Sequence, residues 1–172
     1  MSILPIIIAP DARLKIKCRP VERVDDEVRQ LMDDMLESMH AANGIGLAAP
    51  QVGLDLRIIV VDVAGVNDAP NPIRMANPEV VWVSDDDAKR EEGCLSLPEH
   101  YSTVQRPASV KVSYLDHENN VRELVADDLL ATCVQHEIDH LDGILFVDHI
   151  SALKRNMILR KLTKMKRTEV GV

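Results

Sequence analysis

Two histidines four residues apart give the strongest chemical signal in this 172-residue chain, in the sequence HEIDH at residues 136–140. On an α-helix, residues i and i+4 leave the same face one turn apart, so His136 and His140 can bind one divalent metal ion. Glu137 lies beside that metal and is placed to act as a base. The pattern predicts a metal-dependent hydrolytic site on a helix.

Cys133 precedes this motif by one helical turn and is a candidate for the third protein ligand that such a metal needs. It lies seven residues from His140, which is about 10.5 Å along a helix axis. Ligand atoms on one tetrahedral ion are only about 3.5 Å apart, given bonds of roughly 2.0–2.3 Å. We therefore expect Cys133 to line the wall beside the site and not to bind the metal.

Two other residues remain as candidates for the third ligand. His149 follows the turn expected at Gly143, whereas Cys94 follows Gly93 in an expected loop or strand end, where it can approach the helix freely. A lone cysteine is ordinarily a small buried apolar residue. Without further information, Cys94 is therefore either a metal ligand or a buried residue of the core.

The composition excludes several functional classes. The chain has 20 Lys and Arg against 28 Asp and Glu, a net charge of −8, which argues against general binding to DNA or other nucleic acid. Only one Trp, two Tyr and one Phe are present, too few for a surface that stacks bases. No apolar run approaches the roughly 18 residues that span a membrane. Three cysteines without a disulfide framework indicate a reducing compartment, and we expect a cytoplasmic protein whose apolar N-terminal segment is docked.

The positive charge is concentrated at the C-terminal end. Residues 151–172 contain seven Lys or Arg and one acid, so the preceding residues carry the whole acidic excess. An acidic body with a basic tail suggests that the two parts serve different partners.

Hydrophobic patterns and caps predict the elements that position these residues. One helix is expected from a cap at Asp25 or Asp26 to about Ala42, and a second from Asp127 or Asp128 to Leu141. A third, basic helix is expected to be capped by Ser151. Strands are expected over residues 57–63, 80–83, 110–115 and 121–125, the last two joined by a turn over 116–120. Strands between helices without regular alternation predict an α+β fold, in a single domain of ordinary size.

Three segments together resemble the signature motifs of the peptide deformylase family. They are GIGLAAPQ at residues 44–51, EGCLS at 92–96 and QHEIDHLDG at 135–143, in the family's order and spacing. The resemblance implies one deformylase domain over residues 1–172. It also implies antiparallel sheets packed around a central metal-binding helix, with an N-terminal helix and a basic C-terminal helix.

The resemblance implies a hydrolase that removes the formyl group from N-formylmethionyl nascent peptides and releases formate. A metal-bound hydroxide would attack the formyl carbon, with Glu137 as general base and then acid. The Gln51 side-chain amide and the Leu95 backbone N–H would stabilise the oxyanion. The implied metal ligands are Cys94, His136 and His140. The family's physiological ion is usually Fe²⁺, whereas Zn²⁺ suits the ligand types and Ni²⁺ or Co²⁺ are active substitutes.

The resemblance also assigns the substrate contacts. An extended peptide would pair with main chain near Ile45, Gly46 and Gly93 as an added strand. The methionine side chain would occupy an apolar pocket lined by Ile45, Leu129 and Cys133. Tyr101 departs from the family, in which arginine is common at that position, so preferences beyond the methionine do not carry over. The basic C-terminal helix is expected to dock on the ribosome.

Three other classes of protein share parts of this pattern. A zinc endopeptidase has the same helix motif, but Phe146 stands where one such pattern places a third histidine, and the expected downstream acid is missing. A structural metal module prefers four protein ligands. A cysteine hydrolase using Cys94 and a histidine needs no metal, so activity that survived chelation would indicate it.

Overall fold

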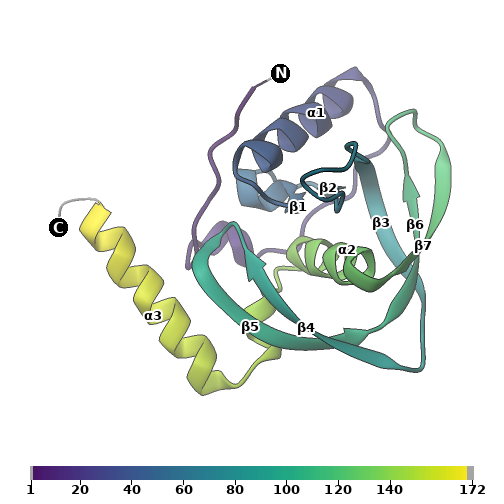
Figure 1. The fold of residues 1–172 in the computed structure, drawn as a ribbon. Helices are drawn as coiled ribbons and strands as arrows, with labels where there is room; N and C mark the ends of the chain where they lie inside the picture. Colours follow the sequence, from purple (N-terminus) through teal and green to yellow (C-terminus); the bar gives the residue numbers. More distant parts are fainter. Residues whose placement is uncertain (1, 170–172) are drawn as a thin grey trace.

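The computed structural model describes residues 2–169 and has two antiparallel sheets and three α-helices (Figure 1). The larger sheet has the strand order β1-β2-β3-β6-β7, and β4 pairs with β5 in the smaller one. The strands are β1 (Gly46–Ala48), β2 (Ile58–Val61), β3 (Ile73–Val83), β4 (Asp87–Cys94), β5 (Leu97–Pro107), β6 (Ser109–Leu115) and β7 (Val121–Asp127). The helices are α1 (Asp26–Ala41), α2 (Asp128–Leu141) and α3 (Ala152–Glu169), with short 3-10 turns η1 (Ala12–Lys15), η2 (Ala49–Val52) and η3 (Phe146–His149). The predicted α+β class is confirmed.

Helix α1 begins and ends close to its predicted bounds. The Asp25 side chain accepts a hydrogen bond from the Val28 N–H at 2.9 Å, which satisfies a free donor of the first turn. Three methionines on one face, Met32, Met35 and Met39, are fully buried and pack against β1 and β2. Their i, i+3, i+7 spacing is the signal by which the helix was predicted.

Strand β3 is longer than the predicted strand over 80–83. Asn77 adopts a left-handed conformation (φ 50°), and the register between β3 and β6 shifts on either side of Val80. Pro78 has no N–H with which to donate a hydrogen bond to the neighbouring strand. A bulge allows the segment to remain in the sheet despite the missing bond. The predicted strand over 80–83 is therefore only the last part of a longer, irregular strand.

The β4–β5 sheet was not predicted. Its sequence is largely polar and shows no apolar alternation, although the two strands pair continuously from Asp87 opposite Pro107 to Gly93 opposite Tyr101. Strand β4 ends at Cys94, which agrees with the expected strand end. The sheet therefore carries Cys94 toward α2 on a rigid, hydrogen-bonded support.

Helix α2 lies at the centre of the molecule, between the two sheets (Figure 1). Nine of its residues are buried, and they include polar side chains as well as apolar ones. It packs on β1, β2, β6 and β7, and its charged side chains bond to β4 and β5. This placement confirms a central helix that bears the HEIDH motif.

The N-terminal segment is docked on the body, as predicted. The Ile7 N–H donates to the Gln51 carbonyl at 2.7 Å, and the Ala9 N–H donates to the Ser96 carbonyl at 2.8 Å. We call residues 7–9 the N-terminal strap. Their side chains join a buried cluster with Leu97 and residues of η3 and α3.

Helix α3 lies on the outside of the molecule, with its last turns beside the N-terminal strap (Figure 1). Ser151 caps it by accepting a hydrogen bond from the Lys154 N–H at 3.2 Å. Leu162 is buried in the same cluster as the strap, and the Lys166 amine donates to the Ile8 carbonyl at 3.2 Å. Within residues 2–169, no helix is long and apolar enough to cross a membrane.

Candidate metal centre

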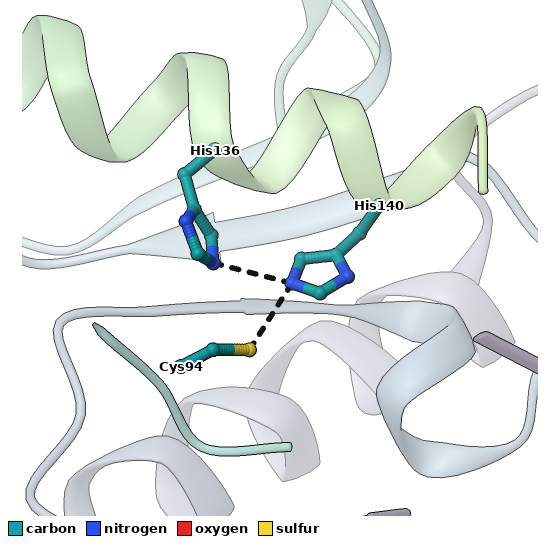
Figure 2. Close-up of side chains that lie close together, drawn as sticks. All are labelled: Cys94, His136 and His140. Carbon is teal, nitrogen blue, oxygen red and sulfur yellow. Dashed lines mark hydrogen bonds between the residues drawn. The ribbon is translucent and has the colours of Figure 1, made fainter. Parts of the chain in front are cut away.

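Three side chains converge between α2 and the end of β4. Figure 2 shows His136 and His140 extending from one face of α2 toward Cys94 on the opposite strand. The His140 Nε2 atom lies 3.2 Å from His136 Nε2 and 3.4 Å from Cys94 Sγ, and all three atoms lie within 4.8 Å of one another. The structure thus brings together the three ligands that the resemblance implies.

The donor set fits a divalent metal ion. His136 Nδ1 donates to Glu92 Oε1 at 3.0 Å, which leaves the lone pair of Nε2 directed at the other two ligands. Two imidazole nitrogens 3.2 Å apart share a proton in a hydrogen bond, and a metal cation bound to both would take the place of that proton. The two spacings from His140 Nε2, 3.2 and 3.4 Å, match the distance of roughly 3.5 Å between two ligand atoms on one tetrahedral ion. Cys94, His136 and His140 are therefore the residues that would hold the metal.

A buried network of charges fixes His136. Arg106 donates through Nε and Nη2 to both carboxylate oxygens of Glu92, at 2.7 and 2.9 Å, and through Nη1 to Asp139 at 2.8 Å. His149 lies 2.8 Å from the same Asp139 oxygen. Burial alone would raise the pKa of Glu92, but the hydrogen bonds from His136 and Arg106 hold it at about 2. Glu92 thus remains a carboxylate that orients the imidazole.

Glu137 lies beside the converging ligands. Its side chain is buried, and burial raises the pKa of its carboxyl to about 7 although His136 acts in the opposite direction. The Oε1 atom has no hydrogen-bond partner within residues 2–169. A carboxyl that titrates near neutrality can both accept and return a proton.

Gly46 of β1 gives Glu137 its space. A Cβ atom at residue 46 would overlap the Glu137 carboxylate and lie 2.9 Å from Cys133 Sγ. The Cys133 thiol is 3.5 Å from the Ile45 carbonyl, and burial raises its pKa well above the ordinary value. Cys133 lies outside the group of converging ligands, beside the site, where it was expected.

The Gln51 side chain approaches Cys94 from η2. Its Nε2 atom lies 3.4 Å from Cys94 Sγ and 3.1 Å from Ser96 Oγ, and its Oε1 accepts from the Ala48 N–H at 2.9 Å. Leu95 follows Cys94 directly and lines the cavity that opens above these residues. Both expected oxyanion donors therefore lie beside the converging ligands.

A cavity of about 400 Å³ opens above these residues. It contains most of the expected substrate-binding residues but not Leu129 or Cys133. Leu129 is 42% exposed in the first turn of α2. The lining residues are Asn43, Gly44, Ile45, Gly46, Gln51, Gly93, Cys94, Leu95, Leu97, Pro98, Glu99, Tyr101, His136 and Glu137.

Tyr101 forms part of the cavity mouth. It pairs with Gly93 across the β4–β5 sheet, and a Cβ on Gly93 would lie 2.5 Å from the tyrosine ring. The ring therefore packs directly over the Gly93 backbone and leaves 65% of the residue exposed. An aromatic side chain therefore forms this wall of the cavity mouth.

Glu92, Arg106 and Asp139 had no role predicted from the sequence. One signal was available, because Glu92 lies two residues before Cys94 and shares its face of a strand. Another was Asp139, a charge inside a motif whose helix is mostly buried. No sequence pattern indicated that Arg106 would pair with Glu92 and Asp139, because the three residues come from separate segments of the chain.

Comparisons with known proteins agree with this geometry. A sequence model of the polypeptide deformylase family matches residues 3–156. The chain is 57% identical to a peptide deformylase of Methylocella silvestris, over 95% of this chain and 85% of that one. It is 51% identical to a peptide deformylase of Agrobacterium fabrum, over 99% and 100% of the two chains. A crystal structure of peptide deformylase from Ehrlichia chaffeensis in complex with actinonin superposes with a TM-score of 0.93 at 42% identity, covering 97% of this chain and 99% of that one.

Proposed function

The chain belongs to the polypeptide deformylase family of enzymes, and on that premise we propose that it removes the formyl group from N-formylmethionyl nascent peptides. The reaction is hydrolysis of a linear amide, and it releases formate and a free amine. One observation carries the proposal: Cys94, His136 and His140 converge beside a buried Glu137 at the base of a cavity.

We infer that Cys94, His136 and His140 hold one divalent ion per chain, Fe²⁺ in the cell, with Zn²⁺, Ni²⁺ or Co²⁺ as alternatives. When bound, such an ion lowers the pKa of a water molecule toward neutrality and polarises the formyl carbonyl. The thiol and imidazole ligands suit transition metals better than Mg²⁺ or Ca²⁺. Metal analysis of protein purified without oxygen would identify the element.

Glu137 is the proposed proton carrier. Burial raises the pKa of its carboxyl toward neutrality, a range in which the carboxylate can take a proton from the attacking water. The protonated form then returns that proton to the leaving amine, which completes the cleavage. The buried Oε1, without a partner in residues 2–169, is free for this exchange.

Gln51 and Leu95 are the proposed donors to the oxyanion. Gln51 Nε2 lies beside Cys94, and the Leu95 N–H belongs to the next residue along the chain. Donors fixed before the reaction stabilise the charge that develops on the carbonyl oxygen without having to reorient.

We propose that the peptide enters the cavity as an added strand, along the main chain of Ile45, Gly46 and Gly93. These three residues line the cavity, which supports this path. The methionine side chain is assigned to an apolar pocket that involves Ile45, Leu129 and Cys133. Cys133 Sγ lies 3.5 Å from the Ile45 carbonyl, so two of the three are neighbours.

The partners follow from the substrate. A peptide with a formylated terminus is a chain still emerging from the ribosome, and we infer that the enzyme meets it in the cytoplasm. The exposed basic residues of α3 support docking on the phosphate-rich ribosome surface. We also infer that residues 1–172 act as one deformylase domain.

Release of formate from formyl-Met-Ala-Ser by metal-loaded protein tests the function. Acetyl-Met-Ala-Ser is the matched control, because it presents the same peptide with a bulkier acyl group. Chelation is expected to abolish turnover, and adding Fe²⁺, Co²⁺, Ni²⁺ or Zn²⁺ to restore it. No formate from the loaded enzyme would contradict the proposal, and turnover that survived complete chelation would indicate a cysteine hydrolase.

A further inference from the structure

Ser96 is a fully buried hydroxyl that the mechanism above does not use. It ends the EGCLS segment and lies in the turn between β4 and β5, two residues after Cys94. Its exposed fraction is 0%. A buried hydroxyl needs a hydrogen-bond partner, and Ser96 Oγ has one in Gln51 Nε2 at 3.1 Å.

This contact determines the direction of the Gln51 amide. The Gln51 Oε1 atom accepts from the Ala48 N–H at 2.9 Å, so the oxygen faces the backbone of β1. An amide nitrogen has two N–H bonds. One donates to Ser96 Oγ, and the other is then directed toward Cys94 Sγ, 3.4 Å from the nitrogen. Ala48 and Ser96 together fix the plane of the amide.

The backbones of both residues are held as well. The N-terminal strap donates from Ile7 to the Gln51 carbonyl and from Ala9 to the Ser96 carbonyl, at 2.7 and 2.8 Å. The strap therefore holds the main chains of Gln51 and Ser96 next to each other. The distance between Ser96 Oγ and the Gln51 amide is constrained by main chain and not by side-chain packing alone.

We propose that Ser96 is a positioning residue: by accepting one N–H of the Gln51 amide, its hydroxyl keeps the second N–H beside Cys94, from where it would donate to the developing oxyanion. The proposal rests on the role given to Gln51 under the proposed function. Without the hydroxyl, the terminal torsion of Gln51 loses one of its restraints, and such sp³–sp² torsions have broad minima. The N–H then samples other directions, which weakens a contact made in the transition state more than it weakens substrate binding.

The test is a double-mutant cycle with Ser96→Ala and Gln51→Ala, assayed on formyl-Met-Ala-Ser with metal content measured in each variant. Ser96→Ala is expected to lower kcat about three- to tenfold, the range of one hydrogen bond, with KM within about twofold. In the Gln51→Ala background the same change is expected to have no further effect on kcat.

Ser38→Ala is the matched control. Ser38 is also a buried serine, and its hydroxyl accepts from the Leu4 N–H at 2.7 Å, but it contacts α1 and not Gln51. It is expected to leave kcat unchanged even if it lowers the melting temperature. This comparison separates a positioning role from a general loss of stability.

A second readout does not depend on turnover. In zinc-loaded, ¹⁵N-labelled protein, the two Gln51 side-chain amide protons are expected to exchange slowly with solvent, and one to show a cross-relaxation signal to the Ser96 β protons. Ser96→Ala is expected to accelerate the exchange. Wild-type protein without that signal would overturn the proposal.

The outcomes distinguish the two levels of inference. If Gln51→Ala lowers kcat but Ser96→Ala does not, or lowers it equally in both backgrounds, the positioning role of Ser96 is wrong and the oxyanion role of Gln51 stands. If Gln51→Ala itself leaves kcat unchanged, both assignments are wrong, whereas deformylase activity of the wild-type enzyme is unaffected by either result.

Discussion

Helices α2 and α3 both carry many charged or ionisable side chains, but in opposite environments. In α2 the polar side chains His136, Glu137 and His140 are buried, and His136 is tied to another buried charge. Among residues 152–168 of α3 only Leu162 is buried, and most of the basic residues lie in solvent. Buried charges around α2 interact strongly with their neighbours, because the surrounding dielectric is low and the side chains are held in place. Exposed charges of α3 interact weakly, because water and salt screen them. Single substitutions should therefore have large effects near α2 and small, additive effects in α3.

The largest effect is expected at Glu137. Glu137→Gln removes the proton carrier and keeps the size of the side chain, so turnover is expected to fall by about 10²–10⁴-fold while the metal stays bound. Formate release and metal content of the purified variant check both parts. Glu123→Gln, an exposed change on β7, is the control and should retain wild-type turnover. Near wild-type turnover by Glu137→Gln would remove Glu137 from the mechanism.

A change in the buried network is expected to reduce stability. Arg106→Met leaves Glu92 and Asp139 without their guanidinium partner, and removing one member of a buried ion pair costs about 3–5 kcal/mol of unfolding free energy. Chemical denaturation of the zinc-loaded protein measures this loss.

Arg122→Met is the matched control for that variant. Arg122 pairs with Asp116 at 2.8 Å, but its side chain is 58% exposed. Loss of such a surface pair is expected to leave the unfolding midpoint nearly unchanged. Equal destabilisation by Arg106→Met and Arg122→Met would show that the burial of an ion pair does not determine the loss of unfolding free energy.

The two cysteines near α2 are expected to differ in their effect on the metal. Cys94→Ser replaces a soft thiolate ligand with a hydroxyl and should weaken metal binding by more than about 100-fold. Cys133→Ser should leave the metal bound and mainly raise KM for formyl-methionyl substrates. Competition with a chromophoric chelator measures the affinity. If Cys133→Ser loses the metal and Cys94→Ser keeps it, the ligand set is wrong.

The smallest single effects are expected in α3. Truncation before the helix would remove Leu162 from its cluster, so neutralisation of the exposed residues Lys154, Arg160, Lys161 and Lys164 to Gln is the sharper change. Each substitution should weaken ribosome binding modestly and lower its salt dependence, because fewer counterions are released. Turnover of formyl-Met-Ala-Ser should not change. Salt-insensitive binding by both the wild type and the fourfold variant would contradict docking through α3.

The same contrast explains how far the sequence could predict the structure. The bounds of α1 and α2 were predicted closely because periodicity and caps are local signals, and the spacing of His136 and His140 determined their common face. Strands β4 and β5 were missed because they are polar and are stabilised by partners from elsewhere, such as Arg106 with Asp139. Ser96 lies in a recognised motif, but no role was predicted for it because its hydrogen-bond partner Gln51 lies 45 residues away.

The N-terminal strap has a consequence for the order in which the molecule is made. Ile8 is bonded to Lys166, 158 residues later, and packs in a cluster with Leu162. At roughly 5–20 residues per second, the ribosome supplies these partners about 8–30 s after the strap itself. Ile7 and Ile8 are therefore synthesised well before Leu162 and Lys166, the residues of α3 that cover them in the folded chain. The strap that holds Gln51 and Ser96 thus gains its own contacts with α3 only after the rest of the body has been synthesised.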